Sequence, residues 1–315
     1  MKTKIAILGA GMLGKYLESY FDKYDKSKYF IKLYSKYAID ITDDNAIESI
    51  VKEYDYIINC AAYTNVDKAE LESELCYAVN ASAVNTLSKL CNKYYKKLIH
   101  ISTDFVYGGE KNLKTLYKIS EFECTNPVNV YGDSKLLGEI HILNNMDTDY
   151  FILRVSWTFG VTGNNFIKKI AEQLLDKNKK YIEVVNDQIG RPTSVVLIAK
   201  AIDNYIQGNI ISGIYNLQNS GNPVSKFQLA KYIKKCLHSK VKIKPCSSDK
   251  FSGAKRQYNS YLDCSKILLE INLDRKNWNT AVYNYLVFLY PDKAILNKNI
   301  IGKIKKVWLM IKKHF

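Results

Sequence analysis

A glycine-rich turn near the start of the chain restricts the fold more than any other segment. Gly9, Gly11 and Gly14 form a GxGxxG pattern that follows the short apolar run 4–9 and opens the helical pattern 11–21. Glycines at these places permit a tight turn and let a phosphate approach the backbone at the N-terminus of the helix. The pattern alone is weak evidence, but its position on the first strand–helix turn favours a dinucleotide-binding fold.

Strand and helix patterns continue to alternate along the first half of the chain. Short apolar runs at 31–35, 57–60, 98–101 and 151–155 are each followed by polar residues. Such βαβ alternation is typical of a parallel sheet with helices on both faces, which binds ligands where its strands end. We therefore predict an α/β fold, a Rossmann-like doubly wound parallel sheet, with an NAD(P)-binding domain over residues 1–156.

The spacing of the predicted strands and helices changes after Trp157. Helical and strand-like segments continue, but they are spaced differently from those of the first half. We predict that residues 157–286 are mainly a smaller α/β substrate-binding lobe, interwoven with the first domain. The segments concerned are the helical patterns 165–175 and 195–206 and the strand patterns 182–185 and 213–217.

Residues 287–315 are predicted to form a basic amphipathic C-terminal helical extension. Between residues 299 and 315, apolar side chains recur at helical spacing with lysines between them. A helix of this kind binds an anionic membrane surface, which would place the protein at the inner face of the membrane. Packing on the protein itself, or on a second subunit of a homodimer, is the alternative that stays open.

The positive net charge of the chain raises the question of which anionic partner it binds. There are 46 Lys and Arg against 31 Asp and Glu, a net charge of +15. The lysines are scattered along the whole chain and no nucleic-acid-binding motif is present, so a small anionic ligand such as a nucleotide is favoured over nucleic acid.

The sequence also lacks the patterns of membrane or secreted proteins and those of cysteine-based disulfide or zinc sites. No run approaches the roughly 18 apolar residues of a membrane span, and the N-terminus does not resemble a signal peptide, so we expect a cytoplasmic protein. The seven Cys residues form no CxxC pair and have no histidines placed to join them. This argues against a disulfide framework or a zinc site, and we predict no metal site from the residues.

The end of the second strand bears on the choice of cofactor. NAD-binding folds carry an acidic residue there that accepts hydrogen bonds from the ribose, whereas this chain has Ser35 and Lys36. These two side chains suit the 2′-phosphate of NADPH. An ordinary surface lysine is an equally weighted interpretation in so basic a chain, so NADPH is favoured and NADH stays open.

Tyr131 and Lys135 form a YxxxK pattern, which places a phenol and an ammonium on one helix face. In a chain with 25 Tyr the spacing carries little weight by itself, and it recurs at Tyr24 and at Tyr107. Only Tyr131 follows an Asn-Pro helix start and a strand that ends in Thr103.

These three side chains, Thr103, Tyr131 and Lys135, suit the reduction of a ketone. A hydride from a nicotinamide produces an alkoxide, which needs a proton donor and a hydrogen-bond donor in place. A free tyrosine titrates near ~10, and a neighbouring ammonium is expected to lower its pKa by stabilising the phenolate. We predict that Tyr131 supplies the proton, that Lys135 also binds the nicotinamide ribose, and that Thr103 polarises the carbonyl.

Longer motifs extend this interpretation. The most specific blocks are Ala61-Ala-Tyr-Thr-Asn-Val-Asp-Lys-Ala-Glu70, Ser102-Thr-Asp-Phe-Val-Tyr-Gly108, Asn129-Val-Tyr-Gly-Asp-Ser-Lys135 and Asp187-Gln-Ile-Gly-Arg-Pro-Thr193. In order and spacing, over about residues 1–286, the chain resembles the extended short-chain dehydrogenase/reductases, and within them the dTDP-4-dehydrorhamnose reductase family.

This resemblance implies an enzyme, an NAD(P)H-dependent sugar-nucleotide 4-ketoreductase. Its substrate would be dTDP-4-dehydro-L-rhamnose and its product dTDP-L-rhamnose, for cell-surface polysaccharide synthesis. The alternatives are a reductase of another nucleotide sugar (a 6-deoxy-talose, a heptose, or a UDP- or GDP-linked sugar) and a non-catalytic NADP-binding regulatory subunit. Relatives have been associated with Mg²⁺ at a dimer contact, which is the only ground for considering that ion.

The resemblance also assigns roles to residues, in addition to those argued above. Phe105 would lie beside the catalytic Thr103, Tyr131 and Lys135, and Trp157 would offer the sugar a flat face. The expected cofactor-binding residues are Gly9, Gly11, Met12, Leu13, Gly14, Ser35, Lys36, Asp40, Ile41, Ala61, Ala62, Tyr63, Thr64, Tyr131 and Lys135. The expected substrate-binding residues are Val66, Asp67, Thr103, Asp104, Phe105, Trp157, Asn165, Lys255 and Arg256.

The chain departs from the family pattern at three places. The glycine turn is one residue shorter than the usual GxxGxxG, and the chain continues beyond the helix that follows Trp278. The basic motif reads Ala254-Lys-Arg-Gln-Tyr258, where two arginines followed by a proline are typical. Because Lys255 and Arg256 are expected to meet the substrate diphosphate, this difference keeps other nucleotide sugars open as substrates.

Overall fold

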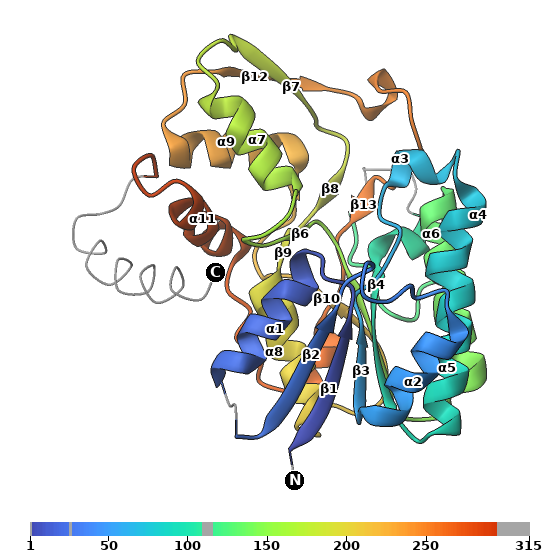
Figure 1. Ribbon diagram of the computed structural model, residues 1–315. Helices are drawn as coiled ribbons and strands as arrows, with labels where there is room; N and C mark the ends of the chain where they lie inside the picture. The colour runs from blue at the N-terminus through green and yellow to red at the C-terminus, as the bar shows by residue number, and fades with distance from the viewer. Residues whose placement is uncertain (1, 25–26, 109–115, 295–315) are drawn as a thin grey trace.

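The computed structural model of the chain describes residues 2–24, 27–108 and 116–294 (Figure 1). Its centre is a six-stranded sheet in the order β10-β5-β4-β3-β1-β2, with every neighbouring pair parallel. The strands are apolar nearly throughout because helices cover both faces of the sheet. They are β1 (Thr3–Leu8), β2 (Tyr29–Tyr34), β3 (Tyr56–Asn59), β4 (Lys97–Thr103), β5 (Tyr150–Val155) and β10 (Gly213–Leu217).

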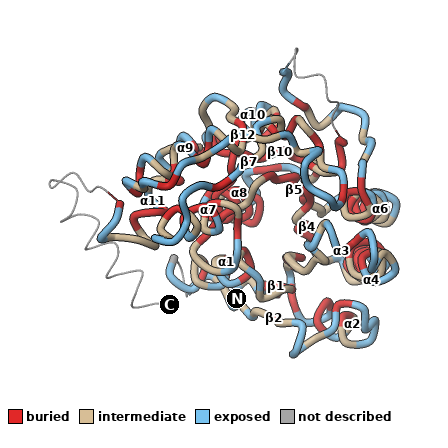
Figure 2. The backbone as a smooth tube through the Cα atoms, turned by 90° about the horizontal axis from the view of Figure 1, so that it is seen from above, coloured by how far each residue is buried: buried red, intermediate tan, exposed pale blue. Residues whose placement is uncertain are grey.

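Two helical layers enclose the sheet. Leu17, Phe21 and Ile198 belong to the core on one face, and Ile47, Leu87 and Ile142 belong to the core on the other. In Figure 2, which looks at the molecule from above, helices with buried residues lie on both sides of the strands. The helices of the first layer are α1 (Met12–Tyr24), α8 (Val195–Ile206) and α10 (Ser265–Glu270), and those of the second are α2 (Asp44–Glu53), α5 (Ala83–Lys93) and α6 (Val130–Asn145). The predicted doubly wound α/β fold is confirmed.

A strand and a helix of this domain come from beyond residue 156. β10 pairs with β5 from Gly213 to Leu217, and the buried face of α8 packs against α1. Residues 195–217 therefore contribute to the main sheet, although they follow the boundary expected at residue 156. That boundary stays a prediction.

A smaller lobe lies above the end of the sheet at which β1 runs into the glycine turn (Figure 1). Its core includes Ile170, Ile233 and Val282, one from each of its three helices. The helices are α7 (Phe166–Leu175), α9 (Lys226–Leu237) and α11 (Trp278–Leu289), and β7 (Tyr181–Val185) pairs with β12 (Lys242–Cys246). Short strands link the lobe to the sheet domain: β6 (Thr158–Phe159), β8 (Ile189–Gly190), β9 (Thr193–Ser194), β11 (Val224–Ser225) and β13 (Asn259–Ser260).

Short helical turns follow two of the central strands. After β3 the chain forms α3 (Val66–Ala69), α4 (Ser73–Tyr77) and the π-helical turn η1 (Ala78–Ser82) before α5 begins. After β4 it forms the 3-10 helix η2 (Asp104–Tyr107), and a second 3-10 turn, η4, spans Ser248–Lys250. These turns carry the polar residues that follow each strand.

The expected C-terminal extension is described only in part. α11 ends at Leu289 and the description ends at Ala294, so the amphipathic pattern of 299–315, with its membrane and dimer alternatives, lies outside the described residues. Among the residues that are described, no helix is long and apolar enough to cross a membrane. All seven cysteines are free thiols.

Candidate active site

The glycine turn leaves backbone exposed at the N-terminus of α1. Gly9 has φ +100°, and a Cβ on it would lie 2.6 Å from the backbone nitrogen of Ala61. A Cβ on Gly14 would lie 2.0 Å from the carbonyl oxygen of Gly9, so neither position accepts a side chain. A Cβ on Gly11 would meet nothing within 4 Å. The space beside Gly11 at the positive end of the helix therefore suits a pyrophosphate.

The first two residues of α1 are placed differently. Leu13 is part of the core under the sheet. Met12 lies beneath the segment that enters α7, because Gly160 and Gly163 both approach its side chain and Asn165 Nδ2 lies 3.9 Å from its sulfur. The contacts of Met12 and Leu13 with the cofactor stay predictions.

The residues expected to bind the adenosine half follow β2. Tyr34, the last residue of β2, accepts a hydrogen bond from Gly9 N at 2.9 Å, so Ser35 and Lys36 begin beside the glycine turn. Lys36 is exposed, and its Nζ lies 5.2 Å from the ring centre of its neighbour Tyr37.

The next pair of expected adenosine-binding residues, Asp40 and Ile41, has local roles of its own. The Asp40 carboxylate accepts from the backbone and hydroxyl of Thr42, and these bonds hold its pKa below the usual value. Ile41 is buried in the core.

The loop after β3 is held by Asn80, a residue to which the sequence argument assigned no role. Asn80 is 1% exposed in the π-helical turn, accepts from Tyr63 N at 2.9 Å and donates to Tyr63 O at 3.1 Å. Ala61 N donates to Asn59 Oδ1 at 3.1 Å. These bonds hold Ala61 and Tyr63, and the chain between and after them with Ala62 and Thr64, beside the carboxyl end of the sheet. π-Bulges often occur at functional sites.

The structure brings the predicted catalytic residues together. Thr103 is the last residue of β4, Tyr131 is the second residue of α6, and Lys135 lies about one turn further along the same helix. Gly132 lets η2 approach α6, since a Cβ there would lie 2.6 Å from Phe105 O. The ring of Phe105 meets that of Tyr131 edge-on, with centroids 5.4 Å apart.

Burial sets the proton states of Tyr131 and Lys135. It raises the pKa of Tyr131 to about 12, although a hydrogen bond with Thr103 acts to lower it. It lowers the pKa of Lys135, which is 1% exposed, to about 8, although the charge of Glu139 acts to raise it. The phenol therefore holds its proton at neutral pH, and the sequence argument had expected the ammonium to lower its pKa.

Lys135 is held in place from the sheet. Its Nζ donates to Ile101 O at 2.8 Å and lies 2.9 Å from His100 Nε2. His100 Nδ1 lies 3.2 Å from the amide nitrogen of Asn59, its partner on β3. Burial and the charge of Lys135 hold the pKa of His100 well below its usual value, so the ring is neutral. The sequence argument missed His100 because a lone histidine in an apolar strand has no motif around it.

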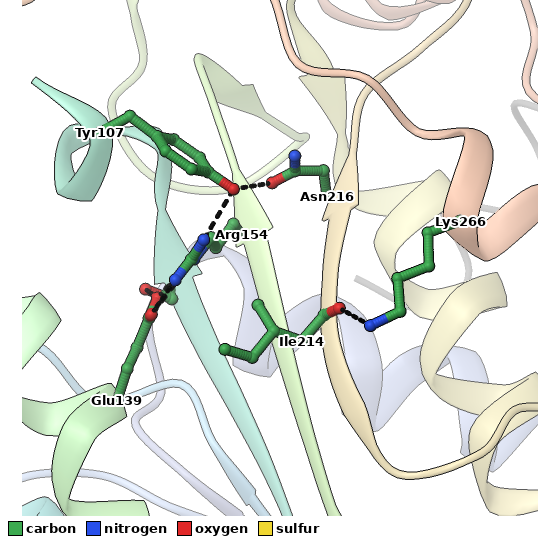
Figure 3. Close-up of polar contacts among 7 residues, drawn as sticks. Tyr107, Glu139, Arg154, Ile214, Asn216 and Lys266 are labelled. Carbon is green, nitrogen blue, oxygen red and sulfur yellow. Dashed lines mark hydrogen bonds and ion pairs between the residues drawn. The ribbon is translucent and has the colours of Figure 1, made fainter. Parts of the chain in front are cut away.

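A buried ion pair anchors α6 to the sheet further along the helix (Figure 3). Glu139 accepts from the Arg154 guanidinium, with Nη2 to Oε2 at 2.6 Å, and from the Ser102 hydroxyl. Arg154 Nη1 donates to Tyr107 OH at 2.7 Å, and Tyr107 OH donates to Asn216 Oδ1 at 2.9 Å. This network connects α6, β4, β5, η2 and β10 behind the catalytic residues.

Segment 253–257 of the lobe contacts α3 and the N-terminus of α6. Arg256 Nη2 forms a salt bridge of 2.8 Å with Asp67 Oδ2 on α3, and Ala254 N donates to Asp67 Oδ1. The Arg256 guanidinium lowers the pKa of Asp67. Lys255 O accepts from Asn129, the N-cap of α6, at 2.7 Å. The predicted substrate residues Asp67, Lys255 and Arg256 thus lie beside the start of α6, the helix that carries the predicted catalytic Tyr131 and Lys135.

Asp104 and Gln257 form a buried polar pair next to Thr103. Gln257 Nε2 donates to Asp104 Oδ2 at 2.7 Å, and Thr103 Oγ1 donates to Asp104 Oδ1 at 3.1 Å. Burial raises the pKa of Asp104 to about 6. Gln257 Oε1 has no hydrogen-bond partner among the described residues. The sequence argument did not single out Gln257, which directly follows the basic pair.

Three other predicted substrate residues have distinct surroundings. Trp157 follows β5 with φ +45°, an uncommon backbone conformation for a bulky residue, and the Lys226 ammonium lies 5.6 Å from its ring. Val66 opens α3. Asn165 caps α7 and donates to Tyr285 OH at 2.8 Å, so its side chain is already engaged within the protein. Its predicted contact with the diphosphate stays a prediction.

No cluster of three His, Cys, Asp or Glu side chains able to hold a metal ion is found within residues 2–24, 27–108 and 116–294. The Mg²⁺ suggested by the resemblance therefore has no identified ligands in this part of the chain.

Comparisons with known proteins agree on one family. The family model for the RmlD substrate binding domain matches residues 3–290. A dTDP-4-dehydrorhamnose reductase from Aggregatibacter actinomycetemcomitans is 35% identical over 298 residues, which cover 90% of this chain and 98% of the relative. The enzyme of that name from Escherichia coli K12 is 30% identical, over 82% of this chain and 88% of the relative.

Solved structures give the same result. The crystal structure of dTDP-4-dehydrorhamnose reductase from Bacillus anthracis in complex with NADP has a TM-score of 0.83 at 33% identity, covering 91% of this chain and 99% of that one. A UDP-glucose 4-epimerase from Thermus thermophilus, in complex with NAD, has a TM-score of 0.71 at 15% identity and supports the fold alone.

Proposed function

The chain belongs to the RmlD substrate binding domain family of dTDP-4-dehydrorhamnose reductases, as its motifs predicted, and we propose that it reduces the C4 ketone of dTDP-4-dehydro-L-rhamnose with NADPH. The observation that carries this proposal is the meeting of Thr103, Tyr131 and Lys135 at the carboxyl end of the central strands, the same end of the sheet as the open glycine turn. A ketone placed there has a proton donor and a hydrogen-bond donor within one site.

The residues of the chain fit the dinucleotide. Gly11 and the N-terminus of α1 would hold the pyrophosphate, Ser35 and Lys36 the 2′-phosphate, and Lys135 the nicotinamide ribose. NADP is bound in the related Bacillus anthracis enzyme, which supports the choice of NADPH over NADH. When bound, the reduced nicotinamide supplies the hydride that reduces the ketone.

The remaining steps belong to the protein. The Thr103 hydroxyl turns from Asp104 to the carbonyl oxygen and donates a hydrogen bond to it as negative charge develops there, and Tyr131 delivers its proton to the same oxygen. A phenol whose pKa is raised to about 12 is protonated before the reaction, as this role requires. The Lys135 ammonium then stabilises the phenolate that is left behind, and the neutral His100 keeps the ammonium in position.

The proposal is tested by following NADPH oxidation with freshly generated dTDP-4-dehydro-L-rhamnose. We expect turnover by the wild type, faster with NADPH than with NADH, and a loss of about 10²- to 10⁴-fold in kcat in Tyr131→Phe. NADPH should still bind to this variant, as measured by fluorescence, because the variant lacks only the phenol oxygen. Tyr95→Phe is the matched control, because Tyr95 is 93% exposed on the surface.

Two results would contradict the proposal. If the wild type binds NADPH but leaves the ketone unreduced, a panel of UDP-, GDP- and dTDP-linked 4-keto sugars would identify another substrate. If none is reduced and the protein copurifies with a larger enzyme, a regulatory subunit becomes the better interpretation. Full activity in Tyr131→Phe would remove Tyr131 as the acid.

A further inference from the structure

A lysine at the start of α9 faces the substrate side of the site without a carboxylate partner in contact. Lys226 Nζ donates to the neutral amide oxygen of Gln188 at 2.6 Å. In the described part of the chain it forms no salt bridge, whereas the neighbouring Arg256 is paired with Asp67. An ammonium shielded from water without a contacting counter-ion is costly, so such a group usually marks a place where an anion binds.

Two aromatic rings define the surroundings of this ammonium. The Nζ of Lys226 lies 5.6 Å from the ring of Trp157 and 5.7 Å from that of Phe166. These rings strip water from the ammonium and hold it by cation–π attraction. The ring of Trp157 was expected to contact the sugar. Lys226 therefore lies close to the expected position of the sugar.

The charged groups around Lys226 come from three other parts of the chain. Burial and the charge of Arg256 lower its pKa to about 8, although the charges of Asp104 and Asp187 act to raise it. Asp104 also accepts a hydrogen bond from the catalytic Thr103 at 3.1 Å. Lys226 and Arg256 are therefore two cations that repel each other close to the catalytic residues.

We propose that Lys226, together with Arg256, binds the diphosphate of the sugar nucleotide and thereby determines which substrates are accepted. The inference rests on the proposed function and adds to it a residue that no motif had identified. In a 4-keto-hexose the diphosphate is attached at C1, across the ring from the ketone. A diphosphate on Lys226 thus holds the sugar over Trp157 with its other end toward Thr103 and Tyr131.

The protonation of Lys226 gives this role a pH dependence. A diphosphate favours the ammonium form, so binding is full below pH 8 and weakens as the pH rises through that value and the free lysine loses its proton. Between pH 7 and pH 9 the dissociation constant should rise about tenfold. Asp104, whose pKa is raised to about 6, is already ionised across this range.

The experiment measures dTDP binding to the full-length protein by calorimetry, without cofactor. We expect Lys226→Met to raise the dissociation constant of dTDP at least about tenfold at pH 7, and Lys226→Arg to restore most of the affinity and abolish the pH dependence. Lys231→Met, an exposed lysine on the same helix, is the matched control. Thymidine, which carries no phosphate, should bind equally to all variants, and melting temperatures show that each is folded.

Several outcomes would overturn the inference. Equal binding of dTDP by the wild type and Lys226→Met would do so, as would an equal loss for thymidine. In turnover, Lys226→Met should raise the KM for the sugar nucleotide and largely keep kcat, and the reverse pattern would indicate a role in the chemical step instead. If the wild type does not bind dTDP, the same series is run with UDP and GDP, and a failure of all three also rejects the inference.

The two proposals fail separately. Binding of a nucleoside diphosphate that depends on Lys226, without reduction of dTDP-4-dehydro-L-rhamnose, rejects the proposed substrate and keeps the inference. Turnover of that ketone with an unaffected Lys226→Met variant rejects the inference and keeps the proposed function.

Discussion

At Tyr131 and Lys135 one cause, burial, acts on two neighbouring groups in opposite directions. It raises the pKa of the phenol to about 12 and lowers that of the ammonium to about 8, because each shift favours the neutral form. A protonated phenol suits the donation of a proton. An ammonium that titrates near neutral pH makes the reaction sensitive to alkali.

We expect the kcat of reduction to fall as the pH rises through about 8, since Lys135 then loses the charge that stabilises the phenolate. The lowered pKa means that the charged form is complete below this value and is lost above it. The measurement is a pH profile of kcat at saturating substrate. The same fall should appear in Lys226→Arg, whose side chain stays charged, and a flat profile up to pH 9 in either protein would argue against this role of Lys135.

Glu139 and Arg154 form the ion pair whose loss should affect stability most. Both side chains are nearly fully buried, so neutralising one leaves the other charge uncompensated in the interior. We expect Glu139→Gln to lower the free energy of unfolding by about 3–5 kcal/mol, measured by urea denaturation. The control is Asp149→Asn, which breaks the exposed pair with Lys97 and should cost at most about 1 kcal/mol. Equal losses in the two variants would contradict the expectation.

Among the elements, two glycines allow close approach for different reasons. One lies in the glycine turn, and the other lies on α6 against the π-helical turn. Gly11 leaves room for a ligand, because no protein atom lies within 4 Å of the place of a Cβ. Gly138 on α6 leaves room for protein, because a Cβ there would lie 2.3 Å from Asn80 O in the π-helical turn. Substitutions at these glycines should therefore affect different properties.

Gly11→Ala should keep the melting temperature of the free protein and raise the dissociation constant of NADPH about tenfold or more, since its methyl group enters the space meant for the pyrophosphate. Gly138→Ala should lower the free energy of unfolding by about 1–3 kcal/mol through overpacking against Asn80. Thermal melting with and without NADPH measures both effects. An unstable Gly11→Ala protein would show that the space beside Gly11 is not open.

For the whole molecule, the position of the lobe over the sheet decides whether a substrate site exists. Segment 253–257 extends from the lobe to α3 and to the N-cap of α6, where it forms hydrogen bonds with Asp67 and Asn129. The bridge between Asp67 and Arg256 is half exposed, and such pairs contribute little to stability. The lobe is thus held mainly by its apolar core and by the short strands that join it to the sheet domain.

Asp67→Asn should accordingly lower the melting temperature by no more than about 2 °C, a difference that salt should reduce further. Calorimetric scans at low and high salt would measure this. A loss of 5 °C or more, independent of salt, would mean that the bridge holds the lobe in place. The oxygen of the new amide group can still accept from Ala254 N, which makes this the mildest variant that removes the charge.

The sequence alone determined the features that depend on neighbours along the chain. Strands such as 4–9 and helices such as 195–206 follow from the period of their apolar residues, and the glycine turn follows from three spaced glycines. Thr103, Tyr131 and Lys135 could be identified because they follow a strand or share a helix face. The family followed from the long motif blocks, in which order and spacing are visible without a structure.

Only the tertiary structure decided which distant residues meet. His100 beneath Lys135, Arg154 against Glu139, and Lys226 over Trp157 join segments with no common motif, and β10 reaches the main sheet from within the range expected for the lobe. The pKa of Tyr131 was misjudged for the same reason. Burial arises from all the segments packed around a group, and the sequence near the tyrosine shows only the lysine on its own helix.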